Sequence, residues 1–187
     1  ELARGADLYV TLEPCNHYGL TPPCTQAIIK AGISRVFISV RDPNPISQGG
    51  RKELLEAGIE VVMGGGMEEA IDMYQGFFKA VEQKRPYVTV KWAMSRDGFL
   101  AKLDGERWQI SGEESLRRVH EMRRQTDAIL VGSGTALADD PMLTCRLSGY
   151  QGRQPLRVVL DRQLRMRVTA AMLERDVPGN TLIVTGP

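Results

Sequence analysis

The chain contains the stretch Glu13-Pro14-Cys15-Asn16-His17-Tyr18-Gly19-Leu20-Thr21-Pro22-Pro23-Cys24, in which two cysteines, each directly after a proline, are separated by eight residues. Proline is common at helix starts. A thiolate there is stabilised by free backbone N–H groups and by the helix dipole. Thiolates are good zinc ligands, and a catalytic zinc needs three protein ligands. The stretch therefore predicts part of a zinc site, whose third ligand comes from elsewhere.

The composition is that of an ordinary globular protein, with 187 residues, of which 42% are hydrophobic and 25% charged. The 24 basic and 23 acidic side chains leave a formal net charge of +1, which argues against broad electrostatic binding of nucleic acid or anionic membranes. No stretch approaches the roughly 18 consecutive apolar residues that a membrane span needs. We therefore expect a cytoplasmic protein that binds neither nucleic acid nor membrane.

The chain has three cysteines, an odd number that suits a reducing compartment and metal binding better than a disulfide framework. From the residues alone, Cys15 and Cys24 could still form a disulfide or remain inert thiols. His17 could reach a metal held by Cys15, whereas Glu13 is expected to brace the loop without binding the metal. Cys145 is expected to be a small buried residue.

The first half alternates β-rich runs with helical stretches, which predicts a layered α/β domain. A longer helix is expected over residues 68–83, with its aromatic side chains in the core. Lys84-Arg85-Pro86 ends this helix, so we place a domain boundary between residues 84 and 85. The expected strands of this half are 7–12, 35–40 and 59–63, and the shorter helices are expected from Cys24 and from about Arg51.

The second half restarts the alternation and is also expected to be α/β. Its first predicted strand is Tyr87–Met94. Ser111, with Glu114 three residues later, predicts a capping box that starts a helix running to about Arg124. Further strands are expected over 127–131, 156–160 and 181–184.

Gly132-Ser133-Gly134-Thr135 follows one of these strands, so its unhindered amides and its hydroxyl could approach a phosphate or a ribose. It lacks the full Gly-x-Gly-x-x-Gly pattern of a dinucleotide-binding loop. The alternative is a tight strand-to-helix turn.

Residues 14–24 and the downstream turn Asp42-Pro43-Asn44-Pro45 closely resemble the bifunctional riboflavin-biosynthesis deaminase/reductase family. Residues 91–98 and 128–146 resemble its reductase part. The resemblance implies the C-terminal part of a cytidine-deaminase-like α/β/α domain, residues 1–84, followed by the first part of a dihydrofolate-reductase-like α/β domain, residues 85–187. It also implies zinc-dependent deamination of a diaminopyrimidinone ribosylamino 5′-phosphate, and then NADPH-dependent reduction of its ribose to a ribityl chain.

The resemblance further implies roles for individual residues. Cys15 and Cys24 would bind Zn²⁺ with a histidine upstream of Glu1, and His17 would line the substrate pocket. Lys91 is the candidate catalytic cation near the sugar, with an ordinary surface lysine as the alternative. The residues at NADPH-contacting positions are Met94, Trp108, Thr135 and Asp139, and those facing the substrate are Arg123, Leu143 and Arg146. Arg96 departs from the family pattern, and so does the spacing of Glu106-Arg107-Trp108. The match is therefore less exact around Trp108, which the resemblance places at a cofactor contact.

In this family a proton-shuttling glutamate follows the upstream histidine, and the resemblance implies that both lie before Glu1. It also implies that only the first part of the reductase is present, so we expect the chain as given to catalyse neither reaction well. Related enzymes suggest a homo-oligomer. One rival function is a nucleoside or RNA-base deaminase, which the long interval between the cysteines disfavours. Another is a non-catalytic binding or structural protein in which the metal loop is a staple. Zinc content and NADPH titration distinguish these alternatives.

Overall fold

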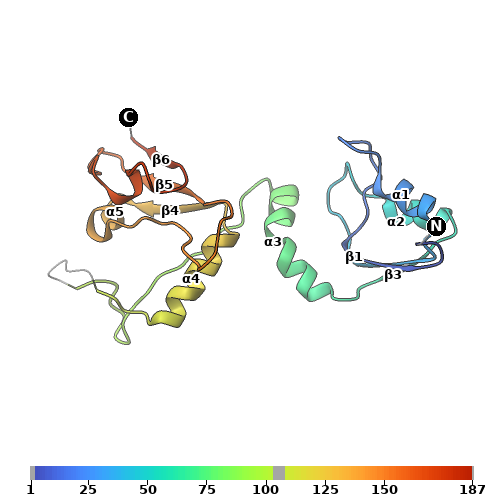
Figure 1. Cartoon of the computed structure of the whole chain (residues 1–187), viewed down its shortest axis with the longest axis horizontal. Coiled ribbons are helices and arrows are strands. Elements are labelled where there is room, and N and C mark those ends of the chain that lie inside the picture. The colour runs from blue at the N-terminus through green and yellow to red at the C-terminus, as the bar shows by residue number, and fades with distance from the viewer. Residues whose placement is uncertain (1–2, 103–107, 187) are drawn as a thin grey trace. The chain divides into compact units, whose positions relative to one another are not determined.

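The computed structural model describes residues 3–102 and 108–186, and the chain divides into two compact units, Glu1–Val90 and Lys91–Pro187 (Figure 1). Each unit has its own three-stranded parallel sheet. Parallel strands need crossover connections. Helices supply them in the first unit, and a helix and a 3₁₀ turn lie in them in the second. The expected α/β class is therefore confirmed for both halves of the chain.

The first unit forms a sheet of strand order β1-β2-β3. Its core lies on one face, where Val36 and Ile38 of β2 are buried with Leu54 of α2, and Ile28 of α1 packs against them. The predicted strands and short helices agree with the structure to within about one residue. The elements are β1 (Asp7–Leu12), α1 (Cys24–Ala31), β2 (Arg35–Val40), α2 (Gly50–Glu56), β3 (Glu60–Met63) and α3 (Met67–Gln83).

Helix α3 lies on the opposite face of this sheet, because Thr11 alternates with the core-facing residues of β1 and its hydroxyl lies 2.9 Å from that of Tyr74. The prediction that the aromatic side chains of α3 lie in the core is wrong. Tyr74, Phe77 and Phe78 are half-buried and pack on one another, and Ile71 is 42% exposed. The helix period correctly indicated one apolar face, but that face is covered only in part.

The second unit forms a parallel sheet of strand order β4-β5-β6. Its core contains Ala136, Leu143, Val159 and Met172. The three strands predicted for its later part are confirmed to within one residue. The elements are α4 (Glu113–Gln125), β4 (Ala128–Gly132), α5 (Ser133–Asp139), β5 (Leu156–Leu160), the 3₁₀ turn η1 (Ala171–Leu173) and β6 (Thr181–Val184).

The predicted strand over Tyr87–Met94 is wrong. The structure has no strand there, and none of the strands within 3–102 and 108–186 pairs with this segment. Val88 and Val90 are each 71% exposed. A β-rich run becomes a strand only where a neighbouring strand satisfies its backbone N–H and C=O groups, and local composition does not supply that neighbour.

The predicted capping box is also wrong. Helix α4 begins at Glu113 with Gly112 as its N-cap, and no side chain bonds to the cap. A capping box needs serine or threonine at the N-cap and glutamate three residues later, and Ser111 lies one residue too early. The two glutamates, Glu113 and Glu114, instead occupy the first turn, where the helix dipole favours negative charge.

Among the described residues, no helix combines the length and the apolar character needed to cross a lipid bilayer.

Candidate functional site

The predicted metal loop connects β1 to α1 and brings its two cysteines together. Helix α1 begins at Cys24, directly after Pro23 at the N-cap. The Cys24 backbone N–H donates a hydrogen bond to Cys15 Sγ over 3.3 Å. The Thr25 N–H donates to the Cys15 carbonyl over 3.4 Å. Both thiols therefore lie at a helix N-terminus, where backbone donors stabilise sulfur in its thiolate form.

The neighbouring Cys15 makes ionisation of the Cys24 thiol more costly. A hydrogen bond with Cys15, then burial, and then the charge of Cys15 raise the pKa of Cys24 above its usual range. A divalent cation removes this penalty, because a coordinating thiol is deprotonated outright. The donor set suits zinc, which prefers thiolate and imidazole ligands. In the part of the chain that the structure describes, no third histidine, cysteine or carboxylate joins the pair.

The start of helix α2 and the residues just before it pack against the metal loop. The Arg51 backbone N–H donates to Glu13 Oε1 over 2.9 Å, and Glu13 is buried. The Asn16 N–H donates to the Ser47 carbonyl over 3.0 Å. Gly50 packs so closely that a Cβ atom there would overlap the Pro14 carbonyl oxygen. Glu13 thus supports the loop, as expected, and does not approach the thiols as a ligand.

His17 belongs to the same loop but differs from its neighbours in its surroundings. Its Nδ1 atom is buried and has no hydrogen-bond partner among the described residues. A buried polar atom without a partner costs free energy. A substrate group bonding to Nδ1 would remove that cost, which agrees with the role in the substrate pocket that the family resemblance implies.

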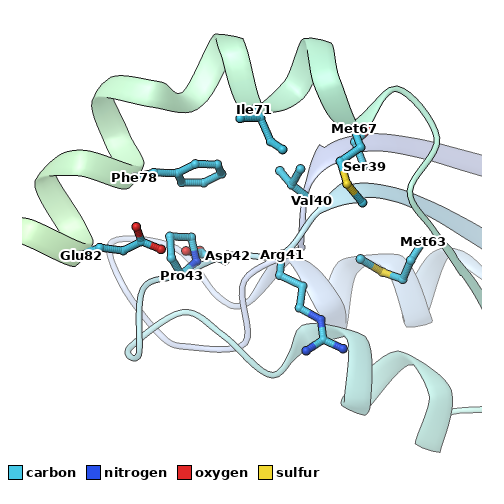
Figure 2. Close-up of a pocket in the computed structure, with 10 residues that line it drawn as sticks. All are labelled: Ser39, Val40, Arg41, Asp42, Pro43, Met63, Met67, Ile71, Phe78 and Glu82. Carbon is cyan, nitrogen blue, oxygen red and sulfur yellow. The ribbon is translucent and has the colours of Figure 1, made fainter. Parts of the chain in front are cut away.

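An open cavity of about 580 Å³ lies in the first unit, where the carboxyl ends of β2 and β3 meet α3 (Figure 2). Ligands of open parallel sheets bind at this end of the strands. In Figure 2, Ile71 and Phe78 of α3 face Val40, while the Arg41 side chain extends away from them. None of the site residues predicted from the sequence lines the cavity.

The second unit brings two of the predicted substrate residues together. Arg123 of α4 donates from Nη1 to the Thr144 carbonyl over 3.0 Å. Arg146 donates from Nη1 to Thr144 Oγ1 over 3.2 Å. Burial and the nearby Arg146 charge lower the pKa of Arg123. Within residues 3–102 and 108–186 neither arginine forms a salt bridge, so the pair is suited to an external anion.

The other predicted residues of this unit differ in how exposed they are. Leu143, with φ of 54°, is buried in the core, so only its backbone could reach a ligand. Lys91, Met94 and Trp108 are exposed, and no hydrogen bond or salt bridge among the described residues joins them to Arg123 or Arg146. Glu106 and Arg107, which precede Trp108, lie outside the described residues.

The glycine-rich segment after β4 is a helix start and not a loop. Helix α5 begins at Ser133, immediately after the last residue of β4, so the alternative of a tight strand-to-helix turn is what forms. Thr135 and Asp139 are four residues apart on this helix and share a face. Arg165 donates to Ser133 Oγ over 2.8 Å and places a cation beside the helix start. Contact of Thr135 and Asp139 with NADPH stays a prediction.

His120, which no sequence motif singled out, lies three residues before Arg123 on α4. Its Nδ1 accepts the Arg146 backbone N–H over 3.1 Å, and its carbonyl accepts the Cys145 thiol over 3.3 Å. A His-x-x-Arg spacing on a predicted helix was the available signal, because residues three apart share a helix face. Cys145 itself is buried, as expected.

We predict a specific pH dependence of stability from His120. Burial, followed by the charges of Arg123 and Arg146, lowers its pKa, and a bond with the Thr144 backbone opposes this in part. The unfolded chain therefore takes up the proton first as the pH falls below about 6.5. His120 stabilises the fold fully above that pH and progressively less as the pH falls through its lower, folded-state pKa.

Urea denaturation of the wild type and of His120→Asn at several pH values measures this effect. The difference between their free energies of unfolding should change as the pH is lowered below about 6.5, because asparagine does not titrate. A pH-independent difference would contradict the prediction.

Comparisons with known proteins extend these observations. The model of the RibD C-terminal domain family matches residues 86–187, and that of the cytidine and deoxycytidylate deaminase zinc-binding region matches residues 2–40. Riboflavin biosynthesis protein RibD of Aquifex aeolicus is 46% identical over 186 residues, which are 99% of this chain and 52% of the relative. The RibD protein of Escherichia coli is 42% identical over 193 residues, covering 97% of this chain and 52% of the relative.

Solved structures agree with this picture. A diaminohydroxyphosphoribosylaminopyrimidine deaminase/5-amino-6-(5-phosphoribosylamino)uracil reductase from Thermotoga maritima matches with a TM-score of 0.89 and 43% identity, over 97% of this chain and 51% of that one. Acinetobacter baumannii RibD matches with a TM-score of 0.88 and 40% identity, over 100% of this chain and 53% of that one. The chain spans about half the length of the relatives it matches.

Proposed function

Since the chain belongs to the RibD C-terminal domain family, we propose that it carries parts of both active sites of a bifunctional riboflavin-biosynthesis enzyme. The first reaction is the zinc-dependent hydrolytic deamination of a diaminopyrimidinone ribosylamino 5′-phosphate. The second is the NADPH-dependent reduction of the ribose to a ribityl chain. The observation that carries the proposal is the presence, in one chain, of a paired-thiol metal loop and of a separate arginine pair without an acidic partner among the described residues.

In the deaminase part, Cys15 and Cys24 would hold zinc. Zinc, when bound, would supply Lewis-acid activation of water near neutral pH. Glu13 holds the loop against α2 through the Arg51 N–H, which keeps the thiols in place. His17 would orient the pyrimidine through its buried Nδ1 atom.

In the reductase part, Arg123 and Arg146 would bind the 5′-phosphate of the substrate. NADPH would supply the hydride. Lys91 would hold a proton near the oxygen of the reacting sugar, and Leu143 would contribute its backbone to the substrate site. The residues that would bind the cofactor are Met94, Trp108, Thr135 and Asp139, with Arg165 as a further cation beside α5.

The remaining expectations concern the class of substrate, the cellular location and the oligomeric state. A small-molecule substrate agrees with the names of the relatives and with the near-zero net charge. We propose a cytoplasmic homo-oligomer, in line with related enzymes.

Two assays test the proposed function, and both use the full-length enzyme that carries this chain, because the chain as given is expected to catalyse neither reaction well. Ammonia release from the diaminopyrimidinone ribosylamino 5′-phosphate should stop when zinc is removed with a chelator. NADPH oxidation should continue in the same chelated sample when the deaminated compound is supplied, because the two reactions use different residues. If ammonia release survives complete zinc removal, or if no NADPH is consumed with the deaminated compound, the corresponding half of the proposal fails.

Replacing Arg123 by alanine should weaken binding of the phosphorylated substrate in the reductase reaction. The change removes one guanidinium and leaves the buried Thr144 carbonyl without its partner. A charge-assisted hydrogen bond contributes about 1.5–3 kcal/mol, or roughly a tenfold to hundredfold change. In the full-length enzyme we expect KM of the reductase to rise by about that factor, while ammonia release is unchanged.

Arg124→Ala is the matched control, because it removes a neighbouring exposed charge of the same helix. Arg123→Lys should lie between the wild type and the alanine variant, since lysine keeps the charge but lacks the planar fork. Equal KM values for Arg123→Ala and Arg124→Ala would remove Arg123 from the phosphate site.

A further inference from the structure

His120 joins α4, which carries Arg123, to the loop that carries Arg146. Its Nδ1 accepts the Arg146 backbone N–H, and its own carbonyl accepts the thiol of Cys145. The two bonds come from adjacent residues of the loop and end on one residue of the helix. Arg123, one helical turn later, bonds to the preceding residue of the same loop. The helix therefore holds three successive loop residues, Thr144, Cys145 and Arg146.

These attachments are not redundant. Cys145 is also held by Gln154, whose side chain accepts the Cys145 N–H over 2.7 Å and donates to its carbonyl over 3.1 Å. Thr144 is buried and bonds to both arginines. For the Arg146 backbone N–H, His120 Nδ1 is the one partner found in the described structure. Losing this bond would release Arg146 and leave the rest of the loop in place.

We propose that His120 is a positioning residue for the anion site: its Nδ1 lone pair holds the Arg146 backbone so that the side chains of Arg146 and Arg123 meet the same phosphate. The proposal rests on the proposed function, in which this pair binds the 5′-phosphate of the substrate. It adds a residue that acts on the substrate only through the placement of another.

The chemistry of the imidazole supports this role. A ring nitrogen that accepts a hydrogen bond carries no proton, so the neutral ring of His120 has its proton on Nε2. The charged groups that face it, Arg123 and Arg146, both disfavour the protonated ring, and so does burial, whereas the Thr144 backbone favours it. The Cys145 thiol bonds to the backbone carbonyl of His120 and leaves the ring free. The surroundings therefore keep Nδ1 available as an acceptor near neutral pH.

Two substitutions of similar size separate positioning from mere packing. In His120→Asn the side-chain amide oxygen lies close to the place of Nδ1 and can still accept the Arg146 N–H. In His120→Gln the amide lies one bond farther out, toward the place of Nε2, and cannot accept in the same geometry. Both variants keep a polar side chain on α4, so a fold that tolerates one should tolerate the other.

The experiment uses sulfate as the phosphate probe, because sulfate keeps its double charge across the neutral range. Sulfate affinity is measured by calorimetry, and hydrogen exchange of the Arg146 amide by NMR. We expect His120→Gln to weaken sulfate binding by about fivefold to tenfold, the equivalent of one hydrogen bond, and to speed Arg146 exchange. His120→Asn should stay within about twofold of the wild type in affinity and keep the amide protected, and Arg124→Ala should behave as the wild type.

The outcomes distinguish this proposal from the proposed function. If the wild type binds sulfate in an Arg123-dependent way and His120→Gln binds it equally well, the positioning role is wrong and the phosphate site stands. The same holds if His120→Asn loses as much affinity as His120→Gln. If the wild type binds no sulfate, or if Arg123→Ala binds it unchanged, the phosphate site is wrong and the positioning role falls with it.

Discussion

Replacing either Cys15 or Cys24 by serine is expected to abolish stable zinc binding. The Cys24 N–H already points at Cys15 Sγ, so the loop and the start of α1 hold both sulfurs as a pair. A serine hydroxyl does not ionise near neutral pH and is a poor zinc ligand. Changes to residues that only support a ligand cost 10–100-fold in metal affinity, so loss of a ligand should cost more than about 100-fold.

Zinc content of the purified variants, measured by mass spectrometry and by chelator competition, checks this result. Cys145→Ala is the matched control, because Cys145 is buried in the second unit and bonds to the His120 carbonyl. It should keep the wild-type zinc content. Full zinc occupancy in Cys15→Ser or Cys24→Ser, at unchanged affinity, would show that the thiols are not the ligands. In the full-length enzyme, reductase activity should survive in both serine variants.

Replacing Gly50 by alanine should destabilise the first unit by about 3 kcal/mol or more, at the upper end of the cost of overpacking. The new Cβ would overlap the Pro14 carbonyl oxygen and lie 2.9 Å from the Pro14 carbonyl carbon and 3.1 Å from Thr25 Cγ2. The contacted Pro14 atoms belong to the backbone next to Cys15. Thr25 is fully buried. Neither can move without displacing the metal loop or α1, so zinc affinity should fall as well.

Gly76→Ala is the matched control for this change. Gly76 lies within α3, and a Cβ atom there meets nothing within 4 Å. Alanine in a helix interior is favoured over glycine by about 0.5–1 kcal/mol, so this variant should be slightly more stable. The free energy of unfolding from urea titration measures both variants. A Gly50→Ala protein as stable as the wild type would mean that α2 does not pack closely against the metal loop.

The metal loop could be predicted from the sequence because its signals are local. Pro23-Cys24 at a helix start and a β-rich run before Glu13 were enough to place both thiols. The strands β2, β5 and β6 were equally clear, since short apolar runs bounded by turn residues have few alternatives. The family resemblance added the roles of Arg123 and Arg146, which no spacing alone would assign.

Other features depend on partners far away in the chain. Tyr87–Met94 has the composition of a strand, yet it forms none, because pairing requires a neighbour that composition does not reveal. The aromatic residues of α3 have the period of a core helix, but the helix lies over a sheet face that it covers only partly. The capping box failed by one residue, which is the usual uncertainty of a helix boundary.

The sequence by itself was enough to predict the α/β class and the pairing of Cys15 with Cys24. Through the family resemblance, it also pointed to Arg123 and Arg146. Only the tertiary structure decided that Thr144 joins Arg123 to Arg146 and that His120 holds the Arg146 backbone. The physical reason is range: helix starts and buried strands follow from residues within about one or two turns of each other. A site built from α4 and a loop more than 20 residues later depends on how the chain packs.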